Sequence, residues 1–324
     1  MDLSVVCPFY NEEGILESAL QSLMARLRQR SDEWELIVVD DGSTDGSRAV
    51  AERVAEDEPR VRVLGYRFNR GRGHALRTGI QAARGDVIVT TEIDLSWGES
   101  IIDDLMEAMV TWPEAEIVVA SPHLAGGGYR NVPFKRVFLS RFGNLVIRLF
   151  ALNAVTMNTG MTRAYRRELI QSLPLTEDGK EFHLEVILKA TAFGARLREI
   201  PAQLEWKDYK HGDTRVGRKS SSRLGPLIVS HSMFSLFAHP VRYVFAISVL
   251  SLTIGFGLLA WAIFLYVTRE VSAYVALLAV LMVLLGIQLF FFGVVLQQQQ
   301  AVQRELWMLQ RGAMVRPRPD QPGT

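Results

Sequence analysis

The stretch Glu35-Leu36-Ile37-Val38-Val39-Asp40-Asp41-Gly42-Ser43 is a short apolar run that ends in two acidic residues and a turn. A run of this kind, bounded by turn residues, is typical of a buried strand. Further runs alternate with segments of helical spacing: strands at 3–7, 61–64 and 86–90, and helices at 12–29, 47–56 and 74–83. Strands and helices that alternate at this interval predict an α/β domain with a mostly parallel, Rossmann-like sheet covered on both faces.

Polar residues follow three of the predicted strands. They are Tyr10-Asn11-Glu12, Asp40-Asp41, and Glu92 with Asp94. Ligands of open parallel sheets lie beyond the carboxyl ends of the strands, where all three groups fall. An ordinary turn with a helix cap would explain one aspartate after the strand at 35–39, but not two adjacent ones. The convergence predicts a binding site at this edge.

Glu92 and Asp94 are the candidate metal ligands. Residues two apart on an extended strand end point to the same side, and carboxylate oxygens suit Mg²⁺ or Mn²⁺. The alternative is an ordinary acidic surface, which the preceding apolar strand argues against. The six histidines are scattered without ligand spacing, so we interpret them as structural or surface residues.

Two long apolar runs dominate the C-terminal third. Residues 243–267 and 271–296 contain no charged side chain. Only the short stretch Thr268-Arg269-Glu270 separates the two runs. Each run exceeds the roughly 20 residues that a helix needs to cross a bilayer. The sequence therefore predicts an integral membrane protein with a two-helix transmembrane hairpin, which also offers a surface for homo-oligomers. The alternative is a pair of core helices in a soluble protein.

Basic residues flank this hairpin on both sides. Those before it are Lys207, Lys210, Arg215, Arg218, Lys219 and Arg223, and those after it are Arg304, Arg311, Arg316 and Arg318. The positive-inside rule then places both termini and the N-terminal domain in the cytoplasm, with a bacterial inner membrane as the expected membrane. Residues 1–4 lack the features of a signal peptide. The expected divisions are a catalytic domain at 1–215, juxtamembrane amphipathic helices at 216–240, the two spans at 241–300, and a partly disordered tail at 301–324.

Composition excludes other classes of protein. Lys and Arg number 36 against 35 Asp and Glu, so a nucleic-acid binder built on bulk basicity is not expected. The single cysteine, Cys7, excludes an intrachain disulfide.

Four motifs occur in order along the first hundred residues. They are Pro8-Phe9-Tyr10-Asn11-Glu12; Val39-Asp40-Asp41-Gly42-Ser43-x-Asp45-Gly46; Asn69-x-Gly71-x-Gly73-x-Ala75-x-x-x-Gly79; and Glu92-x-Asp94-Leu95. Together they resemble the signatures of family 2 glycosyltransferases with the GT-A fold. Within that family the chain is most similar to the polyprenyl-phosphate glycosyltransferases, the dolichol-phosphate mannose synthase group, over roughly residues 3–215.

The resemblance implies roles for individual residues. Pro8, Tyr10, Glu12 and Asp41 correspond to positions that hold the nucleotide, and Arg215 replaces a lysine that meets the donor phosphates. Glu92, Asp94 and Ser96 correspond to positions that hold the metal and diphosphate, and Arg136 and Ser140 to positions that bind the acceptor phosphate. Asp94 and Glu185 are the implied catalytic residues, the latter on a helix facing the site. The implied partners are a nucleotide-diphosphate sugar, a polyprenyl phosphate and a membrane.

Besides Arg215, four residues depart from the family pattern, and one of them is Met157, which stands in place of an aspartate. Glu92 stands in place of an aspartate, while Pro122 and Tyr209 stand in place of arginines that bind the acceptor. The implied reaction is an inverting, metal-dependent transfer of sugar to an undecaprenyl or dolichyl phosphate at the cytoplasmic face. Two alternatives stay open: a processive or oligosaccharide-extending synthase, whose Gln-x-x-Arg-Trp motif is absent, and a non-catalytic membrane scaffold that has retained the fold.

Overall fold

A computed structural model describes residues 1–134, 137–138, 140–141, 144, 155–205, 210–211, 214–215, 240–268 and 273–315. The chain forms two compact units, Met1–Ser232 together with Arg311–Thr324, and Met233–Gln310. Several predictions fall outside the described residues: Arg136, Tyr209, the amphipathic helices predicted at 216–240, apart from residue 240, and the part of the predicted tail from Arg316 onward.

A seven-stranded sheet forms the centre of the first unit. Its strands are β1 (Leu3–Phe9), β2 (Trp34–Asp40), β3 (Val61–Gly65), β4 (Val87–Thr90), β5 (Ile117–Ser121), β7 (Arg163–Arg166) and β8 (Leu197–Pro201). They lie in the order β3-β2-β1-β4-β7-β5-β8. Only β7 is antiparallel to its neighbours in this sheet. The predicted mostly parallel sheet is confirmed.

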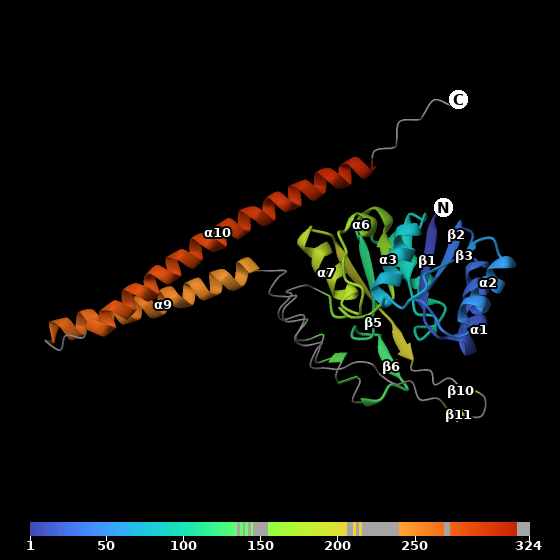
Figure 1. Cartoon of the computed structure of the whole chain (residues 1–324), viewed down its shortest axis with the longest axis horizontal. Coiled ribbons are helices and arrows are strands. Elements are labelled where there is room, and N and C mark those ends of the chain that lie inside the picture. The colour runs from blue at the N-terminus through green and yellow to red at the C-terminus, as the bar shows by residue number, and fades with distance from the viewer. Residues whose placement is uncertain are drawn as a thin grey trace. The chain divides into compact units, whose positions relative to one another are not determined.

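Helices join and cover these strands, as Figure 1 shows. They are α1 (Glu13–Leu27), α2 (Ser47–Glu56), α3 (Arg72–Ala82), α4 (Ile101–Thr111), α6 (Arg167–Ser172) and α7 (Phe182–Ala192). Every residue of β1 and β2 is buried, which requires cover on both faces of the sheet. The continuous apolar runs at 3–7 and 35–39 form the core for this reason.

Two short ladders extend the domain beyond the sheet. Strand β6 (Gly128–Arg130) pairs in parallel with β9 (Gln203–Glu205), and β10 (Lys210–His211) pairs antiparallel with β11 (Thr214–Arg215). The backbone N–H of Glu205 donates to the carbonyl of Ser96 at 2.7 Å. This bond fastens β9 to the turn that carries the acidic pair.

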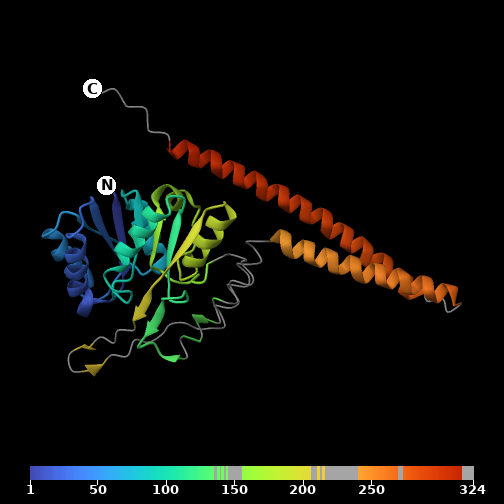
Figure 2. The same cartoon turned by 180° about the vertical axis from the view of Figure 1, so that it is seen from behind.

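The second unit is a pair of long helices, α9 (Pro240–Val267) and α10 (Ala273–Val315), which lie side by side in Figures 1 and 2. Ser248 Oγ donates to the carbonyl of Gly286 at 2.7 Å, and Ser251 Oγ donates to that of Met282 at 2.8 Å. Ser251 lies later in the chain than Ser248, but its partner Met282 lies earlier than Gly286, so the two helices are antiparallel. Small residues at these contacts let the two backbones approach closely, as in membrane helix pairs.

Both helices are long and apolar enough to cross a membrane, over Tyr243–Val267 and Ala273–Trp307. Only 17% and 11% of their most apolar windows are buried, whereas a core helix of a soluble protein is mostly buried. Their apolar side chains therefore face outward, which favours the membrane prediction over the soluble alternative. Helix α10 also continues through Gln297–Gln300 and on to Val315, beyond the predicted end of the second span at residue 300.

Candidate active site

A pocket opens where the strand order of the sheet reverses. Strand β1 has β2 on one side and β4 on the other, and ligands of doubly wound sheets bind outside the carboxyl ends at such a switch point. The pocket is lined by Pro8, Phe9, Tyr10, Glu12, Asp41, Arg72, Glu92, Ile93 and Met161. The structure thus brings together five of the predicted residues, Pro8, Tyr10, Glu12, Asp41 and Glu92, from three strand ends.

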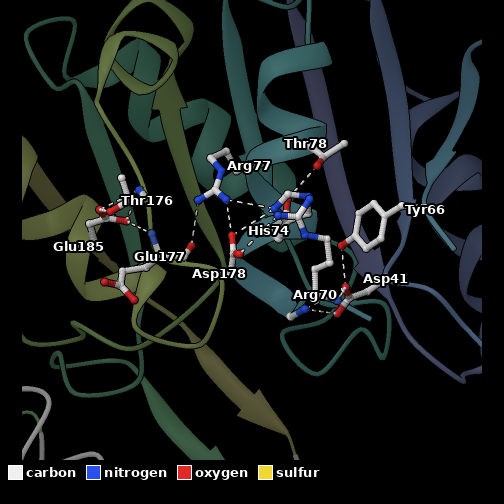
Figure 3. A network of polar contacts seen from close by, with 11 residues as sticks. Asp41, Tyr66, Arg70, His74, Arg77, Thr78, Thr176, Glu177, Asp178 and Glu185 are labelled. Atoms are coloured by element: carbon white, nitrogen blue, oxygen red, sulfur yellow. Dashed lines mark hydrogen bonds and ion pairs between the residues drawn. The ribbon is translucent and has the colours of Figure 1, made fainter. Parts of the chain in front are cut away.

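Asp41 is the most heavily bonded of these side chains. Although it lines the pocket, it is only 5% exposed. Its carboxylate accepts hydrogen bonds from the Tyr66 hydroxyl at 2.6 Å and from Asn69 Nδ2 and the backbone N–H of Arg70 and Gly71, each at 3.0 Å (Figure 3). Asp41 therefore organises the loop that leads into α3, in addition to its predicted place at the nucleotide.

Arg72 is a pocket-lining cation that sequence reasoning missed. It is the first residue of α3, and its Nη1 lies 3.7 Å from Glu92 Oε1. The signal in the sequence was an arginine between Gly71 and Gly73 directly after a strand and loop. The sequence analysis assigned the donor cation to Arg215 instead, whose backbone lies in β11 but whose side chain is outside the described part of the structure.

The two glycines beside Arg72 have a packing role. Gly71 has a φ of 101°, and a Cβ there would lie 2.5 Å from the carbonyl oxygen of Asp178. A Cβ on Gly73 would lie 2.6 Å from the carbonyl oxygen of Gly179. The loop at 177–179 thus lies directly on the start of α3. The glycines permit this close approach of two backbones rather than forming a loop for phosphate alone.

Asp178 holds that loop in place, as Figure 3 shows. Its backbone carbonyl accepts a bond from the N–H of His74 at 3.1 Å, and its carboxylate lies 3.1 Å from His74 Nδ1 and forms an ion pair with Arg77. Burial would raise the pKa of Asp178, but the bonds from Arg77 and His74 lower it overall. The start of α3, and with it Arg72, is therefore fixed by contacts on both sides.

The acidic pair differs from its predicted geometry. Strand β4 ends at Thr90, and Leu95 has a φ of 50°, so Glu92 and Asp94 lie in a turn rather than on an extended strand. Ser96 nevertheless contacts both: its hydroxyl donates to Glu92 at 2.8 Å and its N–H donates to Asp94 at 3.0 Å. Trp97 Nε1 also donates to Glu92 at 3.2 Å. Glu92 and Asp94 thus both contact Ser96, as expected of side chains that point to the same side. The turn produces this arrangement, not the alternation of side chains along a strand.

Negative charge is concentrated beneath this turn. Cys7 on β1 is completely buried, and burial raises the pKa of its thiol. The negative charges of Asp94, Glu92 and Glu12 raise that pKa further. Hard oxygen donors in such a field fit a divalent cation. Among the described residues, no group of three or more Asp, Glu, His or Cys forms a metal cage.

Glu185 lies on α7 and is 2% exposed. Its carboxylate accepts bonds from the N–H groups of Thr176 and Glu177, each at 2.9 Å, and from Lys189 Nζ at 2.7 Å. Burial alone would raise its pKa, but these bonds outweigh burial and lower it. Glu185 therefore supports the loop that Asp178 fastens to α3 (Figure 3). It is not among the residues that line the pocket, and its catalytic role stays a prediction.

Of the two predicted acceptor residues, the structure describes only Ser140. Its hydroxyl lies 3.1 Å from the Tyr129 hydroxyl, and its carbonyl accepts a bond from Asn144 Nδ2 at 2.9 Å. Pro122, which replaces an arginine of the family, is buried directly after β5.

Comparison with curated proteins finds relatives that are named as glycosyltransferases or undecaprenyl-phosphate transferases. The chain is 30% identical over 222 residues to glycosyltransferase AglD of Haloferax volcanii, which covers 67% of this chain and 34% of that protein. It is 29% identical over 236 residues to an undecaprenyl-phosphate 4-deoxy-4-formamido-L-arabinose transferase of Pseudomonas fluorescens. This match covers 72% of this chain and 63% of that protein. It is 27% identical over 299 residues to the transferase of the same name from Pectobacterium carotovorum. This match covers 90% of this chain and 86% of that protein. The chain thus spans about a third of the first relative and less than two thirds of the second.

Among solved structures, the chain resembles glucosyl-3-phosphoglycerate synthase from Mycobacterium tuberculosis. The crystal structure of that enzyme with Mn²⁺, uridine diphosphate and glucosyl-3-phosphoglycerate has a TM-score of 0.54 at 20% identity, covering 72% of this chain and 79% of the synthase. A second crystal structure, with uridine diphosphate, has the same TM-score at 21% identity and covers 73% and 79%. This likeness confirms the predicted GT-A fold.

The family itself follows from the sequence match over the catalytic half. The model for glycosyl transferase family 2 matches residues 4–173, which span the sheet from β1 to β7 and contain every described residue of the pocket. With the pocket at the switch point and the acidic turn beside it, this match shows that the chain belongs to glycosyl transferase family 2.

Proposed function

We propose that this protein transfers a sugar, with inversion, from a nucleotide-diphosphate sugar to a polyprenyl phosphate at the cytoplasmic face of a membrane. The observation that carries the proposal is the pocket of Tyr10, Glu12, Asp41, Arg72 and Glu92 in a chain that also has two helices of membrane length. Two of its relatives are named as undecaprenyl-phosphate transferases, which supports a lipid phosphate as acceptor. Self-association through the helices stays an expectation.

Mg²⁺ or Mn²⁺ is the proposed cofactor, held by Glu92 and Asp94 with Ser96 beside them. Since the described residues contain no complete cage, donor phosphates and water would supply the remaining ligands, as is common for Mg²⁺. When bound, a divalent cation neutralises charge that develops on the leaving diphosphate.

The side chains of the pocket would bind and orient the donor. Tyr10 is 42% exposed at the pocket wall and offers a ring for stacking on the base, while Pro8, Glu12 and Asp41 would hold the nucleoside. Arg72 and Arg215 would pair with the diphosphate. A phosphate acceptor is already ionised at neutral pH, so orientation by Arg136 and Ser140 matters more than removal of a proton.

A turnover assay tests the proposal. The purified full chain is incubated with a set of nucleotide sugars and a short polyprenyl phosphate, with and without Mg²⁺ or Mn²⁺. We expect a lipid-linked sugar of inverted anomeric configuration. The unphosphorylated polyprenol is the control and should not react. Formation of longer glycan chains would favour a processive synthase, and no turnover with any donor would favour the scaffold.

Arg72→Met should weaken nucleotide binding about 10- to 100-fold, because a hydrogen-bonded contact to a charged group contributes roughly 1.5–3 kcal/mol. Methionine keeps an unbranched side chain at the first position of α3 and removes the charge together with the N–H donors. Titration with a nucleoside diphosphate measures the effect. Arg70→Met is the matched control. Arg70 lies in the same loop just before Arg72, but its Nη2 lies 3.9 Å from Asp178 Oδ2 and it does not line the pocket. Equal effects of both substitutions would show that Arg72 acts only through long-range charge.

The proposed topology is tested by cysteine labelling in a Cys7-free background. With both termini in the cytoplasm, Glu270→Cys should react with an impermeant reagent added outside right-side-out vesicles. Lys219→Cys and Arg316→Cys should react only after the vesicles are opened, because the positive-inside rule keeps their flanking basic segments inside. Labelling of all three positions from outside would contradict the topology.

A further inference from the structure

A buried indole holds Glu92, the proposed metal ligand, and the function proposed above does not use it. Trp97 is only 7% exposed, and its Nε1 donates to Glu92 Oε2 at 3.2 Å. The Ser96 hydroxyl donates to the same oxygen at 2.8 Å. A carboxylate oxygen has two lone pairs, so these two donors engage both lone pairs of Oε2. Together they fix the orientation of the carboxylate.

The other oxygen of Glu92, Oε1, faces a cation of the pocket. Arg72 Nη1 lies 3.7 Å from it, and both Arg72 and Glu92 line the pocket. The Glu92 side chain is 26% exposed, although the two residues that hold Oε2 are buried. The two oxygens therefore have different surroundings. Buried donors hold Oε2, and Oε1 lies on the side from which a cation in the pocket can approach.

The backbone on both sides of Trp97 is ordered, which keeps its indole in place. The N–H of Leu95 donates to the carbonyl of Glu92 at 3.2 Å, and the N–H of Gly98 donates to the carbonyl of Leu95 at 3.0 Å. Gly98 has a φ of 74°, which glycine adopts without strain, and it ends the turn directly after Trp97. A backbone bond from β9 holds the same turn. The indole N–H is therefore presented to Glu92 by a fixed segment.

The length of the side chain at position 92 decides whether the indole can reach it. The family pattern has an aspartate at this position, and this chain has Glu92. An aspartate has one methylene less, so its carboxylate would lie nearer to the backbone by roughly 1.5 Å, the length of one C–C bond. The contact of 3.2 Å with Trp97 Nε1 would then lengthen beyond hydrogen-bond distance. The indole and the longer side chain therefore act as a pair.

We propose that Trp97 is a positioning residue that lets a glutamate serve as metal ligand at position 92. Its N–H and the Ser96 hydroxyl hold Oε2, and Oε1 is offered to the divalent cation. The inference rests on the proposed function and deepens it. The alternative is that Glu92 merely satisfies the N–H of a buried tryptophan, since such groups usually find an acceptor. Under that alternative, Trp97 contributes to folding and not to metal binding.

The test is a double-substitution cycle on the full chain in detergent. Mn²⁺ affinity is measured from the spectroscopic signal of the free ion. Trp97→Phe keeps a packed aromatic ring and removes the N–H donor. It should weaken Mn²⁺ binding about tenfold, because removing a hydrogen-bond partner of a metal ligand typically costs 10- to 100-fold in affinity. In a Glu92→Asp background the same substitution should change the affinity by less than about twofold, since the contact is already absent.

Two controls separate positioning from packing. Trp97→Phe should leave the affinity for a nucleoside diphosphate unchanged in chelator, because Trp97 is not among the residues that line the pocket. Trp112→Phe is the matched variant, since Trp112 lies in the same compact unit but its ring faces the guanidinium of Arg198, with 5.8 Å from Cζ to the ring centroid. It should not alter Mn²⁺ affinity. A loss of packing would act equally with and without Glu92→Asp.

The outcomes distinguish the inference from the proposed function. Unchanged Mn²⁺ affinity in Trp97→Phe, or the same loss with and without Glu92→Asp, would overturn the role of Trp97 alone. Equal losses of Mn²⁺ affinity and nucleotide affinity would also overturn it. A wild-type protein that binds no Mn²⁺ would overturn the proposed cofactor, and the inference with it. A protein whose Mn²⁺ affinity depends on Trp97 but which transfers no sugar would support the inference and overturn the proposed function.

Discussion

Asp94→Asn should reduce sugar transfer on the order of 100-fold or more, the loss typical of removing a main electrostatic element from an active site. Asparagine keeps an oxygen that accepts the bond from the Ser96 N–H, which Asp94 receives at 3.0 Å, so the turn should still form. The lost charge lies in the field of Glu92 and Glu12 that also acts on Cys7. Initial rates at saturating donor and acceptor, over a range of Mn²⁺ concentrations, measure the effect.

A control in the same loop makes this result specific. Glu99 is exposed and lies after the turn, so Glu99→Gln removes a similar charge and should leave the rate unchanged. Binding of Mn²⁺ to the two variants, followed by the spectroscopic signal of the free ion, gives a readout independent of turnover. Wild-type rates in Asp94→Asn, or full activity of the unmodified enzyme in chelator, would refute the assignment.

Much of the fold was predictable because its signals are local. The runs at 3–7 and 35–39 are uninterrupted and apolar, and they became fully buried central strands. The charge-free segments at 243–267 and 271–296 are equally uninterrupted, and the helices α9 and α10 lie there, with most of their apolar residues exposed. Strand β7 was not predictable as the one antiparallel member, because its insertion between β4 and β5 is a matter of topology over long sequence distances.

The site residues that lie at the carboxyl ends of strands were predictable from the sequence. Pro8, Glu12 and Asp41 converge on the pocket because parallel strands deliver their carboxyl ends to one edge. Arg72 was not found, since its role depends on contacts between segments that lie far apart in the sequence, such as its approach to Glu92. The strand geometry assumed for Asp94 was wrong, because the chain turns at Ile93–Leu95 where the sequence gives no glycine or proline as a signal.

Glu185→Gln should lower the free energy of unfolding by about 2–3 kcal/mol, which makes it the most destabilising of the substitutions considered. The two carboxylate oxygens together accept bonds from two backbone N–H groups, the Thr176 hydroxyl and Lys189. An amide replaces one acceptor by a donor, so at least one buried N–H loses its partner and Lys189 loses its counter-charge. Denaturant unfolding of the two proteins in the same detergent measures the difference.

The pH dependence of the effect follows from the lowered pKa of Glu185. A carboxyl whose pKa is lower in the folded state adds stability above its unfolded pKa of about 4.3, and this stability is lost as the pH falls through the folded value. The difference between wild type and Glu185→Gln should therefore be largest near neutral pH and shrink in acid.

The same variant separates the two roles considered for Glu185. If the residue holds the loop at 176–178 against α3, stability and activity should fall together, and Lys189→Met should reproduce part of both losses because it removes the ion pair at 2.7 Å. A residue that touches the reacting atoms would behave differently. Glu185→Gln would then lose turnover at temperatures where the protein is fully folded, and Lys189→Met would not. Because the carboxylate is 2% exposed and already occupied by four donors, we expect the first pattern.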